Sequence, residues 1–126
     1  QRLMKQDGVF EHGRIGHKQL VKELQKSAIF AYPSHFEEIS CISAMKAQAA
    51  GCYALTTDFA ALKETNKHGT KISGSASDEN TMKLFIQELI RMLKEGVDNT
   101  PHIDEFGWDL VAKQWNDDVL VFKKAM

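Results

Sequence analysis

The sequence predicts an α/β domain with a parallel sheet flanked by helices. Short apolar runs of strand length alternate along the chain with longer segments in which apolar residues recur every three or four positions. This alternation is typical of βαβ units, in which a helix returns the chain to the start of the next parallel strand. The 126 residues suffice for one core and not for two, so we expect a single domain over residues 1–126.

The first half of the chain follows this pattern. Residues 2–6 are typical of the end of a helix, and 9–10 of a short strand. Apolar residues three or four positions apart predict an amphipathic helix over 17–26. The compact apolar run 28–32 predicts a strand buried on both faces, which Pro33 ends.

The second half repeats the alternation. The expected elements are strand 53–57, helix 60–67, strand 70–73 and helix 81–94. Ser77 or Asp78 is expected to cap the helix over 81–94, and Gly96 to end it. A last helix is expected from near Trp108. Its apolar stripe, which includes Trp115, predicts packing in the core or against a domain outside this chain.

Polar residues gather at the joint between the apolar strand and the helix after it. Glu37 and Glu38 lie in the connecting loop. The helix is expected to begin near Ser40, with Ser40 or Ser43 as its cap, and to end at Gly51 in a left-handed conformation.

A strand end that leads into a helix N-terminus is where open α/β sheets bind anionic ligands. The first amides of a helix have no partner within it, and the helix dipole favours negative charge there. The backbone amides of Ser40, Cys41 and Ile42 are therefore candidate ligands of a diphosphate. In the alternative interpretation, water and the Ser40 hydroxyl satisfy these groups.

At this joint the residues show a family resemblance. The donor-site segment of retaining glycosyltransferases with the GT-B fold resembles P-S-x-x-E-E-I-S-C-I-x-A-M-K-A-Q-A-A-G, and the family's next element is similar to T-T-D-F-A-A-L-K-E-T-N-K-H-G. More narrowly, these segments are similar to the group 1 (family four) branch, which builds bacterial polysaccharides and glycolipids. The resemblance extends from about residue 8 to the last helix. It implies a Rossmann-like parallel sheet flanked by helices.

The resemblance assigns roles to the two sides of a paired-glutamate motif. Glu38 matches the first glutamate of E-x7-E, which would hold the hydroxyls of the donor sugar, and Glu37 is the rival for this register. The second position departs from the motif, which has a glutamate eight positions after the first. Here the residue eight positions after Glu38 is Lys46, and the one after Glu37 is Met45. An ammonium can donate to a ribose hydroxyl but cannot accept from one. Lys46 is therefore either a substitute ribose contact or a solvated helix residue.

Two further residues match donor-pocket positions of the family. The G-R-I-G turn is expected to place the backbone of Ile15 against a nucleobase, as the corresponding turn does in related enzymes. Glu64, in L-K-E-T, matches another frequent family glutamate near the donor pocket. For both positions the structural alternative is an ordinary surface residue.

Composition and spacing argue against several other classes. The net charge of −1 disfavours a nucleic-acid-binding protein, which needs a basic face. The five histidines do not fall at ligand spacings and there is no D-x-D triplet, so we expect neither a metal site nor a cofactor. Cys41 and Cys52 are typical of packed thiols in a reducing compartment, which predicts a cytoplasmic location. No apolar run approaches the roughly 20 residues needed to cross a bilayer.

The resemblance therefore implies the nucleotide-sugar-binding half of a retaining glycosyltransferase. The expected reaction transfers a hexose from a nucleotide diphosphate sugar to a glycan or lipid-linked acceptor. A complete domain of this kind would have two more strands and a helix before Gln1, so we expect most of the C-terminal half of a larger enzyme. Its partner would be the N-terminal GT-B domain, through which the enzyme would associate with a membrane surface, and the chain alone would be inactive. The alternatives are a GT-B sugar-nucleotide epimerase and a non-catalytic α/β interaction domain.

Overall fold

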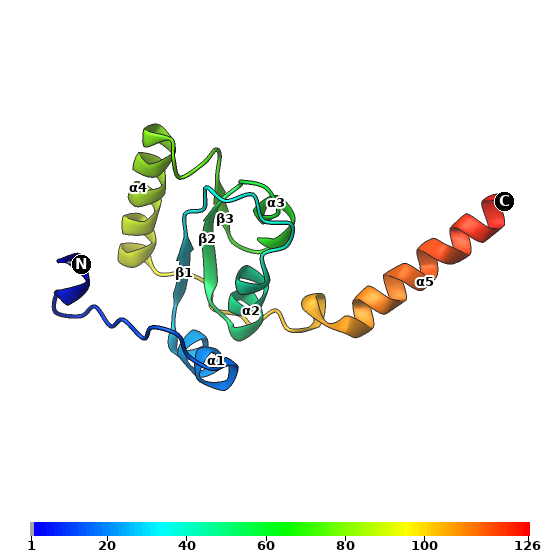
Figure 1. The fold of residues 1–126 in the computed structure, drawn as a ribbon, viewed down its shortest axis with the longest axis horizontal. Coiled ribbons are helices and arrows are strands. Elements are labelled where there is room, and N and C mark those ends of the chain that lie inside the picture. Colours follow the sequence, from blue (N-terminus) through cyan, green and yellow to red (C-terminus); the bar gives the residue numbers. More distant parts are fainter. Residues whose placement is uncertain (1) are drawn as a thin grey trace.

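A three-stranded parallel sheet forms the centre of the protein, with helices on both faces (Figure 1). The structure, a computed structural model, describes residues 2–126. The strands are β1 (Ile29–Tyr32), β2 (Tyr53–Thr57) and β3 (Thr70–Ile72), in that order across the sheet. Both neighbouring pairs run parallel. The predicted α/β fold with a parallel sheet is confirmed.

The helices are α1 (His17–Lys26), α2 (Ile42–Ala50), α3 (Leu62–Thr65), α4 (Glu79–Glu95) and α5 (Trp108–Ala125), with 3-10 turns η1 (Leu3–Lys5) and η2 (Asp104–Phe106). Helices α2 and α3 are the crossovers that parallel strand pairing requires. Figure 1 places α4 on one face of the sheet and α2 and α3 on the other.

The strands bury side chains on both faces because successive residues point in opposite directions. On the α2 side, Phe30 and Tyr32 pack against buried Cys41. On the α4 side, Leu55 packs against Phe85. This two-sided burial explains why the sequence of β1, Ile-Phe-Ala-Tyr, is apolar throughout rather than alternating.

Small side chains let α2 lie close to the sheet, as the sequence predicts. Ala44 and Ala47 are both 0% exposed. Gly51 ends the helix with φ 99°, a left-handed conformation, and its amide donates to the carbonyl of Gln48. The predicted end of this helix is confirmed.

Gln48, which is fully buried in α2, joins that helix to the loop after α3. Its Nε2 donates to the carbonyl oxygens of Ala44 and Thr65, at 2.9 and 2.7 Å. Its Oε1 accepts from the backbone amides of Lys67 and His68, at 3.0 Å each. A buried amide with all four bonds made fixes the position of the 65–68 loop.

Asn66 fixes the same loop to the sheet. Its Nδ2 donates to the carbonyls of Ala54 and Thr70 and to the Thr56 hydroxyl, at 3.3, 3.1 and 2.9 Å. Its Oδ1 accepts from the Gly69 amide at 2.9 Å. The two buried amides thus hold the chain that enters β3.

Several predicted boundaries are wrong. The expected strand at 9–10 is extended chain without a strand partner, and Phe10 is exposed. The helix expected from near Ser40 begins at Ile42, and neither predicted serine caps it: Cys41 occupies the N-cap position without a side-chain cap bond. The helix expected over 60–67 is reduced to α3. Ala60 before it adopts φ 49°, outside the right-handed helical region.

Helix α4 agrees with its prediction at both ends. The Asp78 carboxylate accepts from the Asn80 amide as the N-cap, and Gly96 is the C-cap residue. Helix α5 begins at Trp108 as expected but projects away from the sheet (Figure 1). Trp108 and Trp115 are 85% and 72% exposed, so the first of the two predicted alternatives, packing in the core, is wrong. The second, packing against a domain outside this chain, stays a prediction.

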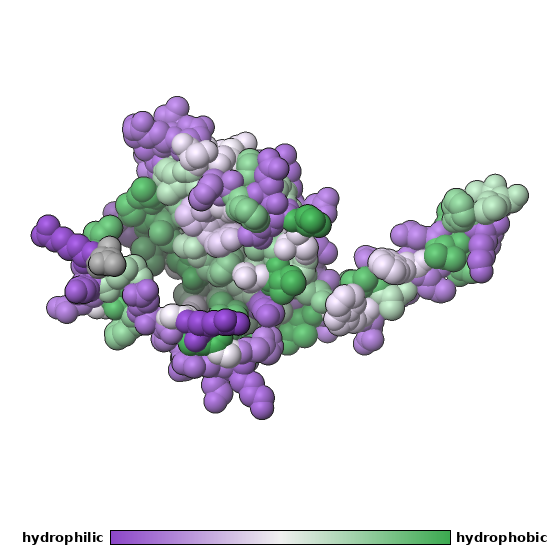
Figure 2. Space-filling view, viewed as in Figure 1, coloured by the Kyte–Doolittle hydropathy of each residue, from purple (hydrophilic) through white to green (hydrophobic). Residues whose placement is uncertain are grey.

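Figure 2 shows apolar atoms interspersed with polar ones along the projecting helix α5. Among the described helices, none combines the length and the apolar character that a membrane span requires.

Candidate functional site

The loop between β1 and α2 is held against the carboxyl end of β2. The Ser34 amide donates to the Thr57 hydroxyl at 3.1 Å, and that hydroxyl donates to the Ser34 carbonyl at 3.0 Å. The Ala76 amide also donates to the Ser34 carbonyl, at 3.2 Å. Ser34 is 4% exposed. The start of the loop is therefore fixed, and it presents its following residues at the carboxyl edge of the sheet.

Glu38 is half-buried at this edge and is fixed by two contacts. The Tyr32 hydroxyl donates to Glu38 Oε1 at 2.5 Å, and the Ala61 amide donates to the Glu38 carbonyl at 3.2 Å. The hydrogen bond to the Glu38 carboxylate, with burial second, raises the pKa of Tyr32 to about 12. The phenol therefore stays a donor. A carboxylate has about four acceptor positions, so most remain for a ligand. The rival residue, Glu37, is exposed.

Cys41 is buried behind Glu38, at 2% exposure. Burial raises the pKa of its thiol to about 11, and the neighbouring Glu38 carboxylate adds to this shift. The side chain is therefore a neutral, packed group, and only its backbone can reach a ligand.

Backbone amides lie unpaired where the loop enters α2. Among the residues that the structure describes, none accepts a hydrogen bond from the amides of Ser40, Cys41 or Ile42. Because α2 begins at Ile42, the amides of Cys41 and Ile42 belong to the helix N-terminus, whereas Ser40 precedes it. The predicted cluster of free amides is present, although its first member lies outside the helix.

Lys46 lies on α2 beside the start of α1. Its Nζ is 3.3 Å from Nδ1 of His17, the first residue of α1. His17 directly follows the G-R-I-G turn, in which Gly13 adopts φ 61° and Ile15 is half-buried. The structure therefore brings Lys46 and the end of this turn together.

Two adjoining hollows open beside α2. The larger, about 600 Å³, lies between α2 and the start of α5, and its lining includes Ser40, Ile42 and Lys46. The smaller, about 240 Å³, includes Ser40 and Glu64. The larger hollow is mainly apolar, and Lys46 is the cation among its lining residues.

The predicted residues thus fall into two groups. Ser40, Ile42, Lys46 and Glu64 line the hollows, whereas Glu38, Cys41 and Ile15 are not among the lining residues. The sequence analysis missed the other side of the larger hollow, which includes Phe106 and Trp108. No local pattern could have found them, since the fold alone brings the start of α5 against α2.

The structure also gathers three side chains that can bind a metal, and the sequence analysis did not find them. His68, His102 and Glu105 each offer one ligand atom, and these atoms all lie within 4.8 Å of one another. The expectation that the chain has no metal site rested on spacing along the sequence, which is blind to residues 34 positions apart.

Comparison with known proteins gives one match. The family model described as "Glycosyl transferases group 1" matches residues 1–105, which include the whole sheet and end before α5. Neither the curated proteins nor the solved structures with which the chain was compared gave a match.

Proposed function

The chain belongs to the group 1 glycosyl transferases, and from this membership we propose that it forms the nucleotide-sugar-binding part of a retaining hexosyltransferase. Family membership gives the reaction class, transfer of a sugar from a donor to an acceptor. The proposed donor is a nucleoside diphosphate hexose, and the proposed acceptor is a glycan or a lipid-linked glycan. We propose that residues 1–126 form one GT-B donor domain and that an N-terminal GT-B domain of the same enzyme binds the acceptor.

One observation carries this proposal. Glu38, fixed by Tyr32, follows the carboxyl end of β1 and lies three residues before Cys41. The amides of Cys41 and Ile42, at the start of α2, donate to none of the residues that the structure describes. An acceptor for sugar hydroxyls and a set of donors for phosphate oxygens therefore lie in one short loop. A diphosphate sugar needs both within a few ångströms of each other.

The amides supply what a departing nucleoside diphosphate requires. Helix α2 is nine residues long, and its dipole places partial positive charge at Cys41 and Ile42. Preorganised donors of this kind stabilise negative charge as it develops on the leaving group. The basic side chains that would complete the phosphate site are proposed to come from outside this chain.

Glu38 would hold the sugar so that its anomeric carbon faces the acceptor. Accurate positioning of two reactants can lower a barrier by about 7 to 11 kcal/mol in favourable cases. The Tyr32 phenol prevents the carboxylate from turning away, because it donates to Oε1 from the end of β1. Tyr32 is therefore proposed as the positioning residue of Glu38.

The nucleoside would extend toward Lys46 and the G-R-I-G turn. One N–H of the Lys46 ammonium can donate a hydrogen bond to His17 Nδ1, which leaves two N–H groups to donate to ribose hydroxyls. Ile15 lies in the turn that leads to His17, so its backbone is proposed to contact the base. Glu64 and Ser40 share the smaller hollow, and Glu64 is proposed to contact the donor from α3.

The exposed apolar side chains of α5 are proposed to contact the N-terminal domain. Trp108, Trp115 and Phe122 are 85%, 72% and 65% exposed, which is unusual for residues of this size. Association with a membrane surface is proposed for the whole enzyme, through that other domain.

The apolar lining of the larger hollow favours one second candidate function. A non-catalytic domain that binds another protein would need such an apolar lining. In such a domain, Lys46 in place of the second motif glutamate would not impair function, because no nucleotide has to be bound. Nucleotide binding separates the two candidates.

Titration of the chain with UDP and with GDP, followed by backbone NMR, tests the proposal. Saturable shifts are expected at residues 40–42 and in the 13–16 turn together. Shifts confined to α5, or no saturable shift with either nucleotide, would favour the non-catalytic domain.

In the whole enzyme, Glu38→Gln should lower turnover at least tenfold while leaving affinity for the free nucleoside diphosphate nearly unchanged. The matched control is Glu37→Gln, because Glu37 is the exposed neighbour in the same loop. Equal losses in the two variants would contradict the assigned register.

A further inference from the structure

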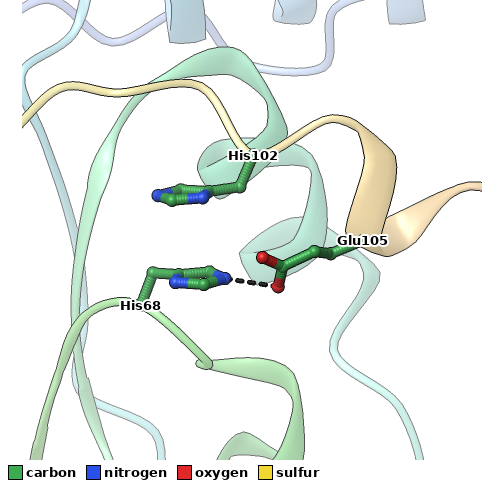
Figure 3. Close-up of side chains that lie close together, drawn as sticks. All are labelled: His68, His102 and Glu105. Carbon is green, nitrogen blue, oxygen red and sulfur yellow. Dashed lines mark hydrogen bonds and ion pairs between the residues drawn. The ribbon is translucent and has the colours of Figure 1, made fainter.

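Three side chains from distant parts of the sequence meet near the amino ends of the strands (Figure 3). His68 lies in the loop that enters β3, His102 in the segment after α4, and Glu105 in η2. The two imidazole rings are stacked, with centroids 3.7 Å apart and planes at 3°. Glu105 Oε2 pairs with Nε2 of His68.

This cluster is separate from the Glu38 loop. His68 lies just before β3 begins, whereas Glu38 follows the carboxyl end of β1. Glu105 also borders the smaller hollow, but His68 and His102 do not. No part of the proposed transfer reaction uses the two histidines.

Gln48 holds the backbone of both histidines. Its Oε1 accepts from the His68 amide at 3.0 Å, and its carbonyl accepts from the His102 amide at 3.0 Å. Gln48 itself is 1% exposed. The backbones of the two residues are therefore fixed relative to each other.

The donor set fits a divalent transition metal. Two imidazoles and one carboxylate, with a remaining position for water, are a common ligand set of Zn²⁺. Tetrahedral bonds of about 2.0 to 2.1 Å place two ligand atoms about 3.3 Å apart. The three ligand atoms lie within 4.8 Å of one another, so their separations are already near this value.

The rings must leave their stacked arrangement to bind one ion, because the lone pairs of parallel rings do not converge. Rotation about the terminal torsion of histidine is soft. The side chains of His68 and Glu105 are 32% and 42% exposed, which leaves room for it.

We propose that His68, His102 and Glu105 bind a divalent transition metal ion of the Zn²⁺ class. The ion fastens the segment over 98–106 to the body of the domain. That segment leads directly into α5, so the bound metal fixes the direction in which α5 leaves the sheet. The proposed ion positions this segment, and no step of the proposed transfer reaction uses it.

Titration of the 126-residue chain with zinc chloride by calorimetry tests the proposal, with cobalt chloride as a spectroscopic probe. One ion per chain is expected, with micromolar or tighter affinity at pH 7.5. Bound cobalt should show the visible absorption of a tetrahedral site. The affinity should fall at least tenfold at pH 5.5, because imidazoles bind metal only in their neutral form.

Variants assign the ligands. His68→Ala and His102→Ala should each weaken zinc binding at least tenfold. Glu105→Gln, which keeps the size of the side chain and removes its charge, should weaken zinc binding by a similar factor. The control is His12→Ala, which removes another histidine that lies near a carboxylate, 4.0 Å from Glu23. Far-UV circular dichroism checks that each variant is folded.

The proposal is overturned by affinity weaker than 100 µM at pH 7.5. It is also overturned if Glu105→Gln, folded as the parent, binds zinc as tightly as the parent, or if His12→Ala loses as much affinity as the cluster variants.

Discussion

Gln48→Glu should destabilise the fold strongly, and by an amount that depends on pH. The substitution keeps the size of the side chain and replaces Nε2 by oxygen. In the parent, Nε2 lies 2.9 Å from the Ala44 carbonyl and 2.7 Å from the Thr65 carbonyl. Two oxygens at these distances repel each other unless the introduced carboxyl carries a proton. The carboxyl is 99% shielded from solvent, because Gln48 is 1% exposed.

The magnitude follows from the cost of holding that proton. An unperturbed glutamate has a pKa near 4.3, and each pKa unit corresponds to about 1.36 kcal/mol. Keeping the buried carboxyl neutral therefore costs about 4 kcal/mol at pH 7 and about 1 kcal/mol at pH 5. A single O–H cannot serve both carbonyls, which adds about 1 to 2 kcal/mol at either pH. The folded pKa is raised, so stability is present at low pH and lost as pH rises.

Urea unfolding followed by far-UV circular dichroism at pH 5 and pH 7 measures the effect. Relative to the parent, Gln48→Glu should lose about 5 to 6 kcal/mol at pH 7 and about 2 to 3 at pH 5. Gln87→Glu is the matched control, since Gln87 is exposed on α4, and it should change stability by less than about 0.5 kcal/mol. The reasoning fails if both variants unfold at the same urea concentration at pH 7.

Three further predictions concern other contacts. Gly69→Ala should lower the free energy of unfolding by more than about 3 kcal/mol, because a Cβ there would lie 1.8 Å from the Ala54 carbonyl oxygen. The control is Gly16→Ala, whose Cβ would meet nothing within 4 Å; it should lower the free energy by less than about 1 kcal/mol in the same urea assay. Burial raises the pKa of Cys41 to about 11, so only about one thiol in a thousand is ionised at pH 8, and iodoacetamide should label it quickly only after unfolding in urea; labelling of the folded chain at the unfolded rate would contradict its burial. Tyr32 has its pKa raised to about 12, so its contribution to stability should be complete below pH 10 and lost as pH rises toward 12; Tyr32→Phe should flatten this loss in urea unfolding, and an unchanged slope would count against the Glu38 contact.

The sequence predicted best those features that depend on neighbouring residues. The strands expected at 28–32, 53–57 and 70–73 correspond to the three strands of the described sheet, and their alternation with helices identifies the parallel pairing. Asp78 and Gly96 mark the ends of α4, because a capping carboxylate and a glycine with positive φ act within one turn of the helix end.

Prediction failed where a competing local conformation or a distant partner decides the outcome. The serines near the start of α2 suggested a cap. Cys41, buried beside Phe30 and Tyr32, takes the N-cap position instead, and the helix begins at Ile42. The apolar stripe of α5 has the right period for a buried helix, yet nothing in the stripe says which surface covers it.

The candidate site shows the same division. Glu38 was singled out from its place after a strand and from its match to the family motif, and in the structure it follows the carboxyl end of β1. Its partner Tyr32 was treated only as the last apolar residue of the strand, although the phenol and the carboxylate are six residues apart. The His68 and His102 pair had no local signal at all, because only the fold brings these residues together.

All strand pairing in the described sheet is non-local, which sets the order of events when the chain folds. Ile29 pairs with Tyr53, 24 residues on, and Leu55 with Thr70, 15 residues on. No hairpin can therefore form early within this sheet, and each ladder must wait until a helix has closed the intervening loop. The crossover between β1 and β2 is α2, whose buried residues are two alanines and one glutamine. These side chains bury little apolar area, so α2 has only a weak driving force to pack before the strands pair. Closure of the 29–57 segment is thus the kinetic bottleneck, and the domain should fold more slowly than a helical bundle of equal length.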